Sequence, residues 1–439
     1  MGLIAKPQRL CLDTQRIAVH GGGTGFASGP SWEDLLSRKR QPMLIQPFSI
    51  TRMPRIEFGA GAIARLPELL GCYGRRVLLV TGARSFQDSI HWQRLLTALD
   101  QATLSWEHCT VHDEPSPALV DEIVRRLHGT GIAVVAGIGG GSVLDAAKAV
   151  AGLLPSGDSV MDYLEGVGPE RPYRGPALPV IAVPTTAGTG SEATKNAVLS
   201  VRGENGFKKS FRDERLVPEY ALIDPDLLAT CPPEQIAANA MDALTQLLES
   251  CVSLRANPFT DALVESGLNA IRQGLFAWYE GGEEEAADGR AQLAYAALIS
   301  GICLAQTGLG AVHGLASPLG AFFPIPHGMV CGTLVAATTR ANIDALRTRD
   351  PDNPARGKYA RLGNLLSGRQ HHNPRNARES LVLTLMDWTE RLRLPRLGAF
   401  GIQETDLPRI VRHSRGSSMK TNPIVLSDEE LLTILRQRL

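Results

Sequence analysis

The sequence has 439 residues, of which 44% are hydrophobic and 5% aromatic, and its 45 Lys and Arg residues balance its 45 Asp and Glu residues. This apolar fraction is sufficient for a full core and excludes a generally disordered chain. A formal net charge of zero provides no long-range field for nucleic acid or a membrane surface, so we expect neither as a partner. The length suggests two domains and one additional segment.

The seven cysteines are scattered and include no C-x-x-C pair, which argues against both a disulfide framework and a sulfur-ligated metal site. The first residues lack a continuous apolar segment and a small-residue cleavage site, so we expect a cytoplasmic protein without a signal peptide. Residues 1–47 are predicted to form a flexible N-terminal extension, although their glycine cluster, Gly21 to Gly25, leaves a phosphate loop as the less favoured alternative.

Strand and helix signals alternate from residue 48 to about 229. Apolar, β-branched runs predict strands at 56–59, 77–81, 103–111, 132–138, 179–184 and 220–224. Helices are predicted between them at 61–70, 88–99 and 117–127. This alternation predicts an α/β domain with a parallel, doubly wound sheet.

Helical signals dominate residues 230–439, with helices predicted at 232–253, 258–280 and 287–309, and solvated loops at 281–285, 347–358 and 368–378. Residues 291–339 contain no Asp, Glu, Lys or Arg, and prolines and glycines interrupt them too often for a membrane span. His313 and His327 lie within this uncharged stretch, on either side of a Gly/Pro-rich bend. Two such histidines favour a metal site or a catalytic proton over ordinary core packing.

Two loops follow predicted buried strands. Gly139, Gly140, Gly141 and Ser142 open a helix, where backbone N–H groups can approach an anion, and Asp145 forms with Ser142 a predicted capping box. The segment 184–192 adds a Ser/Thr-rich loop at the carboxyl edge of the same sheet, where ligands of α/β proteins bind. Either loop alone could be a tight turn or a helix cap; together they favour a dinucleotide cleft.

Five motifs occur in order: GGGSVLDAAK (139–148), PTTAGTGSE (184–192), IDPDL (223–227), MDALTQLLES (241–250) and HGLASPLGAFFPIPHG (313–328). Together they resemble the iron-containing, group III alcohol dehydrogenases of the dehydroquinate-synthase-like superfamily, over about residues 48–439. The resemblance implies a Rossmann-like dinucleotide-binding domain (48–229) and an all-α metal and catalytic domain (230–439). It also implies cofactor contacts, which would come from Gly139, Gly140, Gly141, Ser142, Asp145, Thr185, Thr186, Thr189, Asn196 and Lys208.

The resemblance places a divalent metal, Fe(II) or Zn(II), on Asp242, Gln246, His313 and His327. Asp242, His313 and His327 would then also be catalytic. Two positions depart from the family, which usually has histidine where this chain has Gln246 and Ser317. The first departure affects metal affinity. The second affects the proton route, for which Ser317 is the remaining catalytic candidate.

Cofactor choice follows from the end of the strand at 77–81. Many NAD-using relatives have an acid after this strand, whereas this chain has Gly82, followed by Arg84. An acid would hold the ribose hydroxyls and repel a 2′-phosphate, while Gly82 and Arg84 could accept one. We therefore expect NAD(P), with NADP slightly favoured.

The resemblance and the residues together predict a metal-dependent, NAD(P)-linked alcohol dehydrogenase or aldehyde reductase. Its partner would be a small-molecule primary alcohol or aldehyde, and the resemblance implies a homodimer or larger homo-oligomer. One alternative is a metal-independent reductase resembling the maleylacetate reductases. Another is a cofactor-binding protein that has lost catalysis, with Gln246 and Ser317 as signs of the loss. A lyase resembling dehydroquinate synthase is less favoured.

Overall fold

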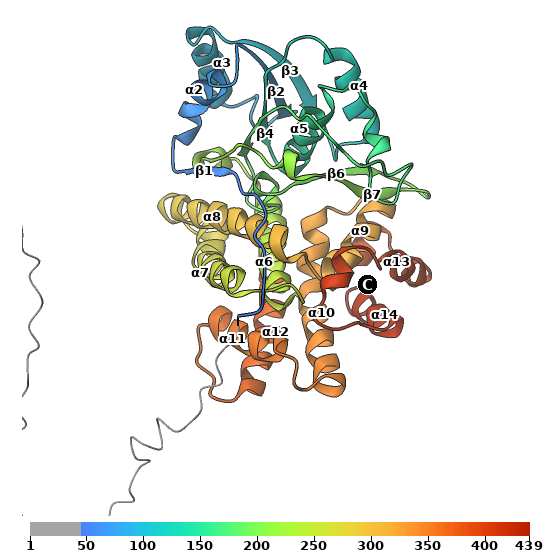
Figure 1. Ribbon diagram of the computed structural model, residues 1–439. Helices are drawn as coiled ribbons and strands as arrows, with labels where there is room; N and C mark the ends of the chain where they lie inside the picture. The colour runs from blue at the N-terminus through green and yellow to red at the C-terminus, as the bar shows by residue number, and fades with distance from the viewer. Residues whose placement is uncertain (1–44) are drawn as a thin grey trace, which may run out of the picture. The chain divides into compact units, whose positions relative to one another are not determined.

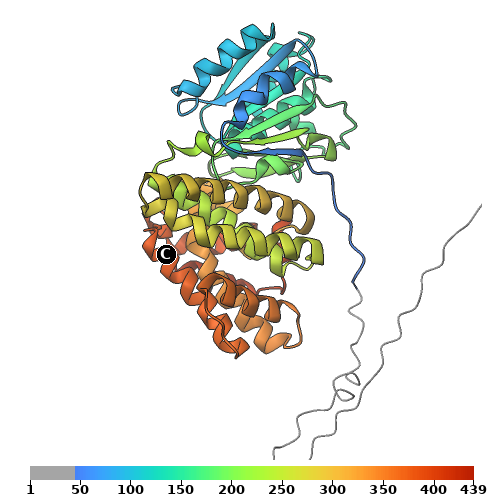
Figure 2. The same cartoon turned by 90° about the vertical axis from the view of Figure 1, so that its left-hand side faces the viewer.

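The computed structural model describes residues 45–439, of which Pro47–Leu439 form one compact unit. The predicted extension therefore falls almost entirely outside the described residues, as does its glycine cluster. Within the compact unit, strands with intervening helices come first and helices follow (Figures 1 and 2). The strands are β1 Arg55–Phe58, β2 Arg76–Gly82, β3 Ser105–Val111, β4 Val134–Gly139, β5 Val180–Pro184, β6 Asn196–Val201, β7 Phe207–Arg212 and β8 Tyr220–Ile223.

Six strands form a wholly parallel sheet in the order β1-β8-β5-β4-β2-β3. The chain runs outward from β2 to β3, returns across the sheet to β4, and then proceeds through β5 to β8 on the other side. The strand order thus reverses between β2 and β4, and in such sheets ligands bind beyond the carboxyl ends of the strands at this switch point. The loop of Gly139 to Ser142 leaves β4 at this position.

The two faces of the sheet pack into different cores, because successive side chains of a strand point in opposite directions. In β2, Val77 and Leu79 join one cluster, and Leu78 and Val80 join another. The first cluster contains residues of α3 (Ile90–Gln101), and the second contains residues of α4 (Pro117–Leu127) and α5 (Gly141–Leu153). The short α2 (Leu66–Gly71) packs with the first cluster. This explains why the buried strands are apolar on both faces.

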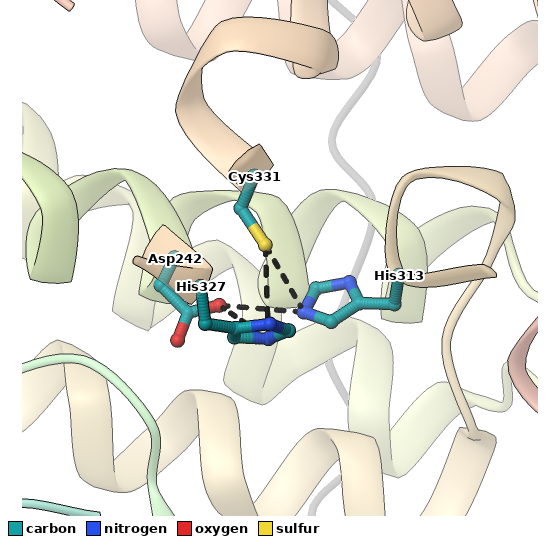
Figure 3. A group of neighbouring side chains, drawn as sticks. All are labelled: Asp242, His313, His327 and Cys331. Carbon is teal, nitrogen blue, oxygen red and sulfur yellow. Dashed lines mark hydrogen bonds and ion pairs between the residues drawn. The ribbon is translucent and has the colours of Figure 1, made fainter. Parts of the chain in front are cut away.

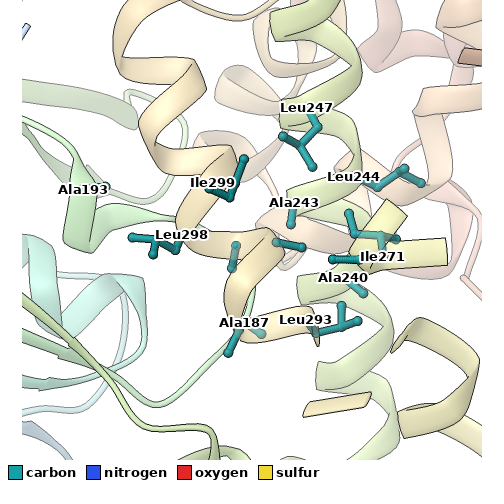
Figure 4. Close-up of a cluster of buried hydrophobic side chains, with 14 of the residues drawn as sticks. Ala187, Ala193, Ala240, Ala243, Leu244, Leu247, Ile271, Leu293, Leu298 and Ile299 are labelled. Carbon is teal, nitrogen blue, oxygen red and sulfur yellow. The ribbon is translucent and has the colours of Figure 1, made fainter. Parts of the chain in front are cut away.

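The second half consists of helices α6 Pro233–Val252, α7 Pro258–Glu280, α8 Glu283–Thr307, α9 Ala311–Phe322, α10 His327–Arg349, α11 Ala355–Ser367, α12 Pro374–Arg391, α13 Leu407–His413 and α14 Asp428–Arg436. The first hydrophobic cluster continues from the sheet into this half. Ala187 and Ala193, which follow β5, lie near Ala243 of α6 and Leu298 of α8 (Figure 4). The sheet and the helices therefore share one core on this side.

The helices were also compared with the length and apolar composition that a membrane span requires. Among the described residues, no single helix has the length and apolar composition needed to cross a membrane. In the same residues, α8 and α9 satisfy these criteria only when taken together, and this pair is bent by 102°. Many residues of both helices are buried in the protein core.

The predicted fold class is confirmed, but the sequence analysis missed one hairpin and some of its local expectations were wrong. The antiparallel hairpin of β6 and β7 was missed, because its polar second strand, FKKSFR, shows little apolar alternation. Glu283 to Glu285 form the first turn of α8, where acidic side chains favour the helix dipole, and not a solvated loop. The predicted capping box is also absent, since Gly140 is the N-cap of α5 and no side chain in the described part of the chain caps that helix.

Candidate metal and cofactor site

Four potential metal ligands from three helices meet at one point (Figure 3). Asp242 lies on α6, His313 on α9, and His327 and Cys331 on α10, and their ligand atoms all lie within 4.8 Å of one another. The Nε2 atom of His313 is 3.3 Å from Oδ1 of Asp242, and that of His327 is 3.9 Å from the same oxygen. The sulfur of Cys331 lies 3.6 Å from Nε2 of His313 and 3.8 Å from Nε2 of His327.

A close approach of α6 and α10 brings these side chains together. Gly328 follows His327 directly, and a Cβ atom added there would lie 2.2 Å from the backbone oxygen of Ala238, one turn before Asp242. Only glycine permits this spacing without displacing a backbone. Cys331 follows His327 by four residues on α10, so both side chains share one face of the helix. The sequence interpretation placed His327 in a loop, whereas it is the first residue of α10.

Glu249 fixes the orientation of His313. Its carboxylate accepts hydrogen bonds from Nδ1 of His313 (2.6 Å), the N–H of Gly310 (2.9 Å) and the N–H of Val312 (2.7 Å). Because Nδ1 donates to Glu249, Nε2 faces Asp242 and Cys331, and it presents its lone pair to an ion there once it has lost its proton. Such a carboxylate–histidine pair commonly orients an imidazole that binds a metal. Sequence reasoning missed Glu249, although its spacing of seven residues from Asp242 places both on one face of α6.

The environment of the cluster sets the charge of each member. Burial lowers the pKa of His327 to about 4, and Lys208 and His313 act in the same direction, so this imidazole is neutral and able to bind a metal. Burial opposes ionisation of Asp242, but His327 and His313 outweigh it and hold the pKa of this carboxyl below its usual value. Burial also opposes a charge on His313, yet Cys331, Glu249 and Asp242 hold its pKa well above the usual range. Without an ion, the positive charge that faces Asp242 is therefore carried by the imidazole of His313, and a bound cation would take its place.

The donor set fits a divalent metal. A carboxylate and two imidazoles suit Fe(II) or Zn(II), and a thiol suits zinc among these. Oδ1 of Asp242 and the two Nε2 atoms converge inside the protein, within 4.8 Å of one another. The Nδ1 atom of His327 is buried and has no hydrogen-bond partner among residues 45–439, so the ring is not fixed by a second polar contact. A positive charge among these atoms would compensate for their desolvation.

Gln246 and Ser317 lie beside the cluster. Nε2 of Gln246 donates to the backbone oxygen of Thr189 (3.3 Å), and its Oε1 accepts from the hydroxyl of Ser300 (2.7 Å). Both ends of the amide are therefore bound to protein groups. The Ser317 hydroxyl donates to the backbone oxygen of Lys208 at 3.4 Å. The metal role of Gln246 and the catalytic role of Ser317 stay predictions.

One cavity of about 550 Å³ joins this cluster to the predicted cofactor loops. Its lining includes the following predicted site residues: Gly141, Ser142, Asp145, Thr189, Asn196, Lys208, Asp242, Gln246, His313, Ser317 and His327. The two loops touch each other, since a Cβ atom added at Gly141 would lie 2.7 Å from the Thr189 hydroxyl oxygen. The structure thus brings most of the predicted residues to one place, although they come from both halves of the sequence.

The other predicted cofactor residues do not line this cavity. Gly139, Gly140, Thr185 and Thr186 belong to the same two loops, but the cavity lining, taken over the described residues, does not include them. The lining does not include Gly82, the last residue of β2, or the exposed Arg84 that follows the strand. Lys208 forms a partly buried ion pair with Glu114, at 2.6 Å between Nζ and Oε1, and both line the cavity.

Comparisons with known proteins agree with this arrangement. The family model for iron-containing alcohol dehydrogenases matches residues 54–225, and the model for the C-terminal part of the Fe-containing alcohol dehydrogenase family matches residues 236–439. Alcohol dehydrogenase 4 of Saccharomyces cerevisiae is 30% identical over 387 residues, which cover 87% of this chain and 95% of the yeast protein.

Two solved structures are also similar. A mutant of an archaeal alcohol dehydrogenase from a Red Sea brine pool aligns with a TM-score of 0.82 and 26% identity, over 90% of this chain and 98% of the other. Sulfoacetaldehyde reductase from Bifidobacterium kashiwanohense, solved in complex with NAD+, aligns with a TM-score of 0.75 and 25% identity, over 89% and 98% of the two chains. The chain belongs to the iron-containing alcohol dehydrogenase family and is an oxidoreductase of the alcohol dehydrogenase class.

Proposed function

We propose that this chain interconverts a primary alcohol and its aldehyde, using NAD(P) and a divalent ion held by Asp242, His313 and His327. One observation carries the proposal: a single cavity is lined both by the glycine loop after β4 and by the cluster of potential metal ligands. A cofactor phosphate at the first site and an ion at the second would leave room for a small substrate between them. This arrangement disfavours the metal-independent reductase and the loss of catalysis.

The protein groups have separable roles in this proposal. Among residues 45–439, no side chain caps the first turn of α5, so its N–H groups are available for the cofactor pyrophosphate. Asp145 instead accepts a hydrogen bond from Ser191 (2.6 Å) and pairs with the buried Lys148 (3.1 Å), which ties the two loops together. When bound, the ion supplies Lewis-acid polarisation of the substrate oxygen, and the nicotinamide supplies the site of hydride exchange at C4.

The remaining cofactor contacts follow from the lining of the cavity. Thr189 and Asn196 line it and would face the nicotinamide side, and Lys208 would contact a ribose. Thr185 and Thr186 precede Thr189 in the same loop and would support it. We also propose the division into a dinucleotide-binding part, 48–229, and a helical metal-binding part, 230–439. The last strand of the sheet ends at Ile223 and α6 begins at Pro233, which supports this boundary.

We further propose that NADP(H) is used at least as well as NAD(H). Gly82 ends β2 without an acidic side chain, and the nearby Arg84 is exposed. The measurement is kcat/KM for both cofactors with one aldehyde. A preference for NAD of about a hundredfold, or roughly 2.7 kcal/mol, would contradict the proposal. Homodimer or larger assembly also stays a proposal, which light scattering of the purified protein tests.

The metal-dependent reaction can be tested with His327→Ala. Turnover of an aldehyde panel should be lost while NAD(P) binding, followed by fluorescence titration, stays near the wild-type value, because the glycine loop lies in the other half of the chain. His372→Ala, at an exposed position, is the matched control. Metal content and thermal melts accompany the assay. Turnover by wild-type protein that contains no metal would overturn the proposal.

A further inference from the structure

Cys331 is the one member of the cluster in Figure 3 that neither the sequence nor the proposed reaction assigned a role. Its side chain is fully buried, and its sulfur points at the two Nε2 atoms that face Asp242. We infer that Cys331 is a fourth protein ligand of the ion, and that the site is an Asp–His–His–Cys site in which Gln246 is not a ligand. The inference rests on the proposed metal site and specifies its chemistry.

The spacing of the four donors supports coordination by sulfur. In a tetrahedral zinc site, bonds of about 2.3 Å to sulfur and about 2.05 Å to nitrogen place these two atoms about 3.6 Å apart. The observed separations from the Cys331 sulfur are 3.6 Å to His313 and 3.8 Å to His327. Nitrogen and oxygen ligands of one zinc lie about 3.3 Å apart. The separation between His313 and Asp242 is 3.3 Å and that between His327 and Asp242 is longer, at 3.9 Å, while all four donor atoms lie within 4.8 Å of one another.

Gln246 is less suited to the fourth position. Its amide oxygen already accepts from Ser300, and its amide nitrogen donates to Thr189, so at most one lone pair of the oxygen is left for an ion. An amide is also neutral, whereas a thiolate adds a negative charge. With Asp242, a Cys331 thiolate would neutralise a divalent ion inside a buried site, where uncompensated charge is costly.

The burial of Cys331 opposes this role only while no cation is present. Burial raises the pKa of the thiol to about 12 in the protein alone. A bound ion reverses this preference, because a thiol that coordinates a metal is deprotonated. Thiolate coordination also shifts the preference of the site toward zinc over harder ions. Four protein ligands remain compatible with catalysis, since catalytic zinc sites can expand to five-coordination.

Cobalt(II) substitution tests the inference without relying on activity. Thiolate ligands give cobalt(II) an intense near-ultraviolet charge-transfer band, which carboxylate, imidazole and amide ligands do not produce. Wild-type protein loaded with cobalt should show this band, and Cys331→Ser should lose it. Cys303→Ser is the matched control, because Cys303 is equally buried, on α8, with its sulfur near the backbone oxygen of Thr260. Gln246→Ala should also keep the band.

X-ray absorption of the zinc-loaded wild type gives a second measurement that needs no variant. The inference expects one sulfur neighbour at about 2.3 Å from zinc. Absence of the band in the wild type, its survival in Cys331→Ser, or a zinc shell without sulfur would each overturn it. If metal-dependent turnover persists in those cases, the proposed function stands and only the role of Cys331 is wrong. If the wild type turns over without any metal, the proposed function itself is wrong.

Discussion

Glu249→Gln replaces a buried carboxylate with an amide of nearly the same shape, so it tests how the hydrogen bonds of this side chain orient His313 for metal binding. In the wild type, one carboxylate oxygen accepts from the N–H of Val312, and the other accepts from the N–H of Gly310 and from Nδ1 of His313. An amide keeps one acceptor and replaces the other with a donor. Whichever way it is turned, at least one buried N–H group must lose its partner.

The structure sets the expected size of the effect. One buried donor without a partner costs about 1–3 kcal/mol, so the free energy of unfolding should fall by this amount. If the amide NH2 faces Nδ1, the imidazole must turn or change its tautomer, and Nε2 no longer presents its lone pair to the ion. Loss of such an orienting partner typically lowers metal affinity by about 10–100-fold. Glu249→Ala should cost more, because all three bonds are lost.

The assay measures zinc affinity by competition with a chelator, together with a urea unfolding curve for each variant. Glu379→Gln is the control, because Glu379 forms an exposed ion pair with Arg340. Exposed pairs contribute about 0–1 kcal/mol, so this variant should bind zinc like the wild type. If Glu249→Gln holds zinc within twofold of the wild type and unfolds at the same urea concentration, Glu249 does not orient His313 as described.

Three further changes test other parts of the structure. Gly328→Ala should push α6 and α10 apart, lower the free energy of unfolding by about 1–3 kcal/mol and weaken metal retention. Gly357→Ala is the control and should have none of these effects, because no described atom lies within 4 Å of its new Cβ atom. Equal metal loss in the two variants would refute this reasoning. Burial raises the pKa of Glu192 from 4.5 to about 7. Between these two values the folded state binds more protons than the unfolded state, so the free energy of unfolding falls as the pH rises from about 4.5 to about 7. Glu192→Gln should therefore raise the melting temperature at pH about 8 but not at pH about 4, and equal shifts at both would contradict the assignment. Arg84→Ala should lower kcat/KM for NADP by about tenfold and leave that for NAD unchanged, and equal losses would place Arg84 away from a 2′-phosphate.

The parallel sheet and the long helices could be predicted because their signals are local. The predicted helix at 117–127 coincides with α4, and that at 258–280 coincides with α7, since a proline and a polar cap mark where each begins. The hairpin of β6 and β7 could not be predicted, because its polar strand gains its burial from tertiary packing.

The candidate site was only partly predictable for a different reason. His313 and His327 attracted notice because their surroundings are uncharged, and the family resemblance added Asp242. Cys331 and Glu249 gave no such signal: a cysteine and a glutamate on helices are common, and their partners lie 18 and 64 residues away along the chain. The available signs were the spacing of four residues between His327 and Cys331 and that of seven residues between Asp242 and Glu249.

The hydrophobic cluster shared by the sheet and the helices has a consequence for how the protein can be divided. Gly190 lies so close to α8 that an added Cβ atom would be 2.4 Å from Gly301, and Ala187 and Ala193 pack in the same region. A fragment that ended near residue 229 would expose this apolar surface to water, with a tendency to aggregate. The cofactor-binding half is therefore poorly suited to expression alone or to exchange between relatives, and such chimaeras would need α6 and α8 to accompany it.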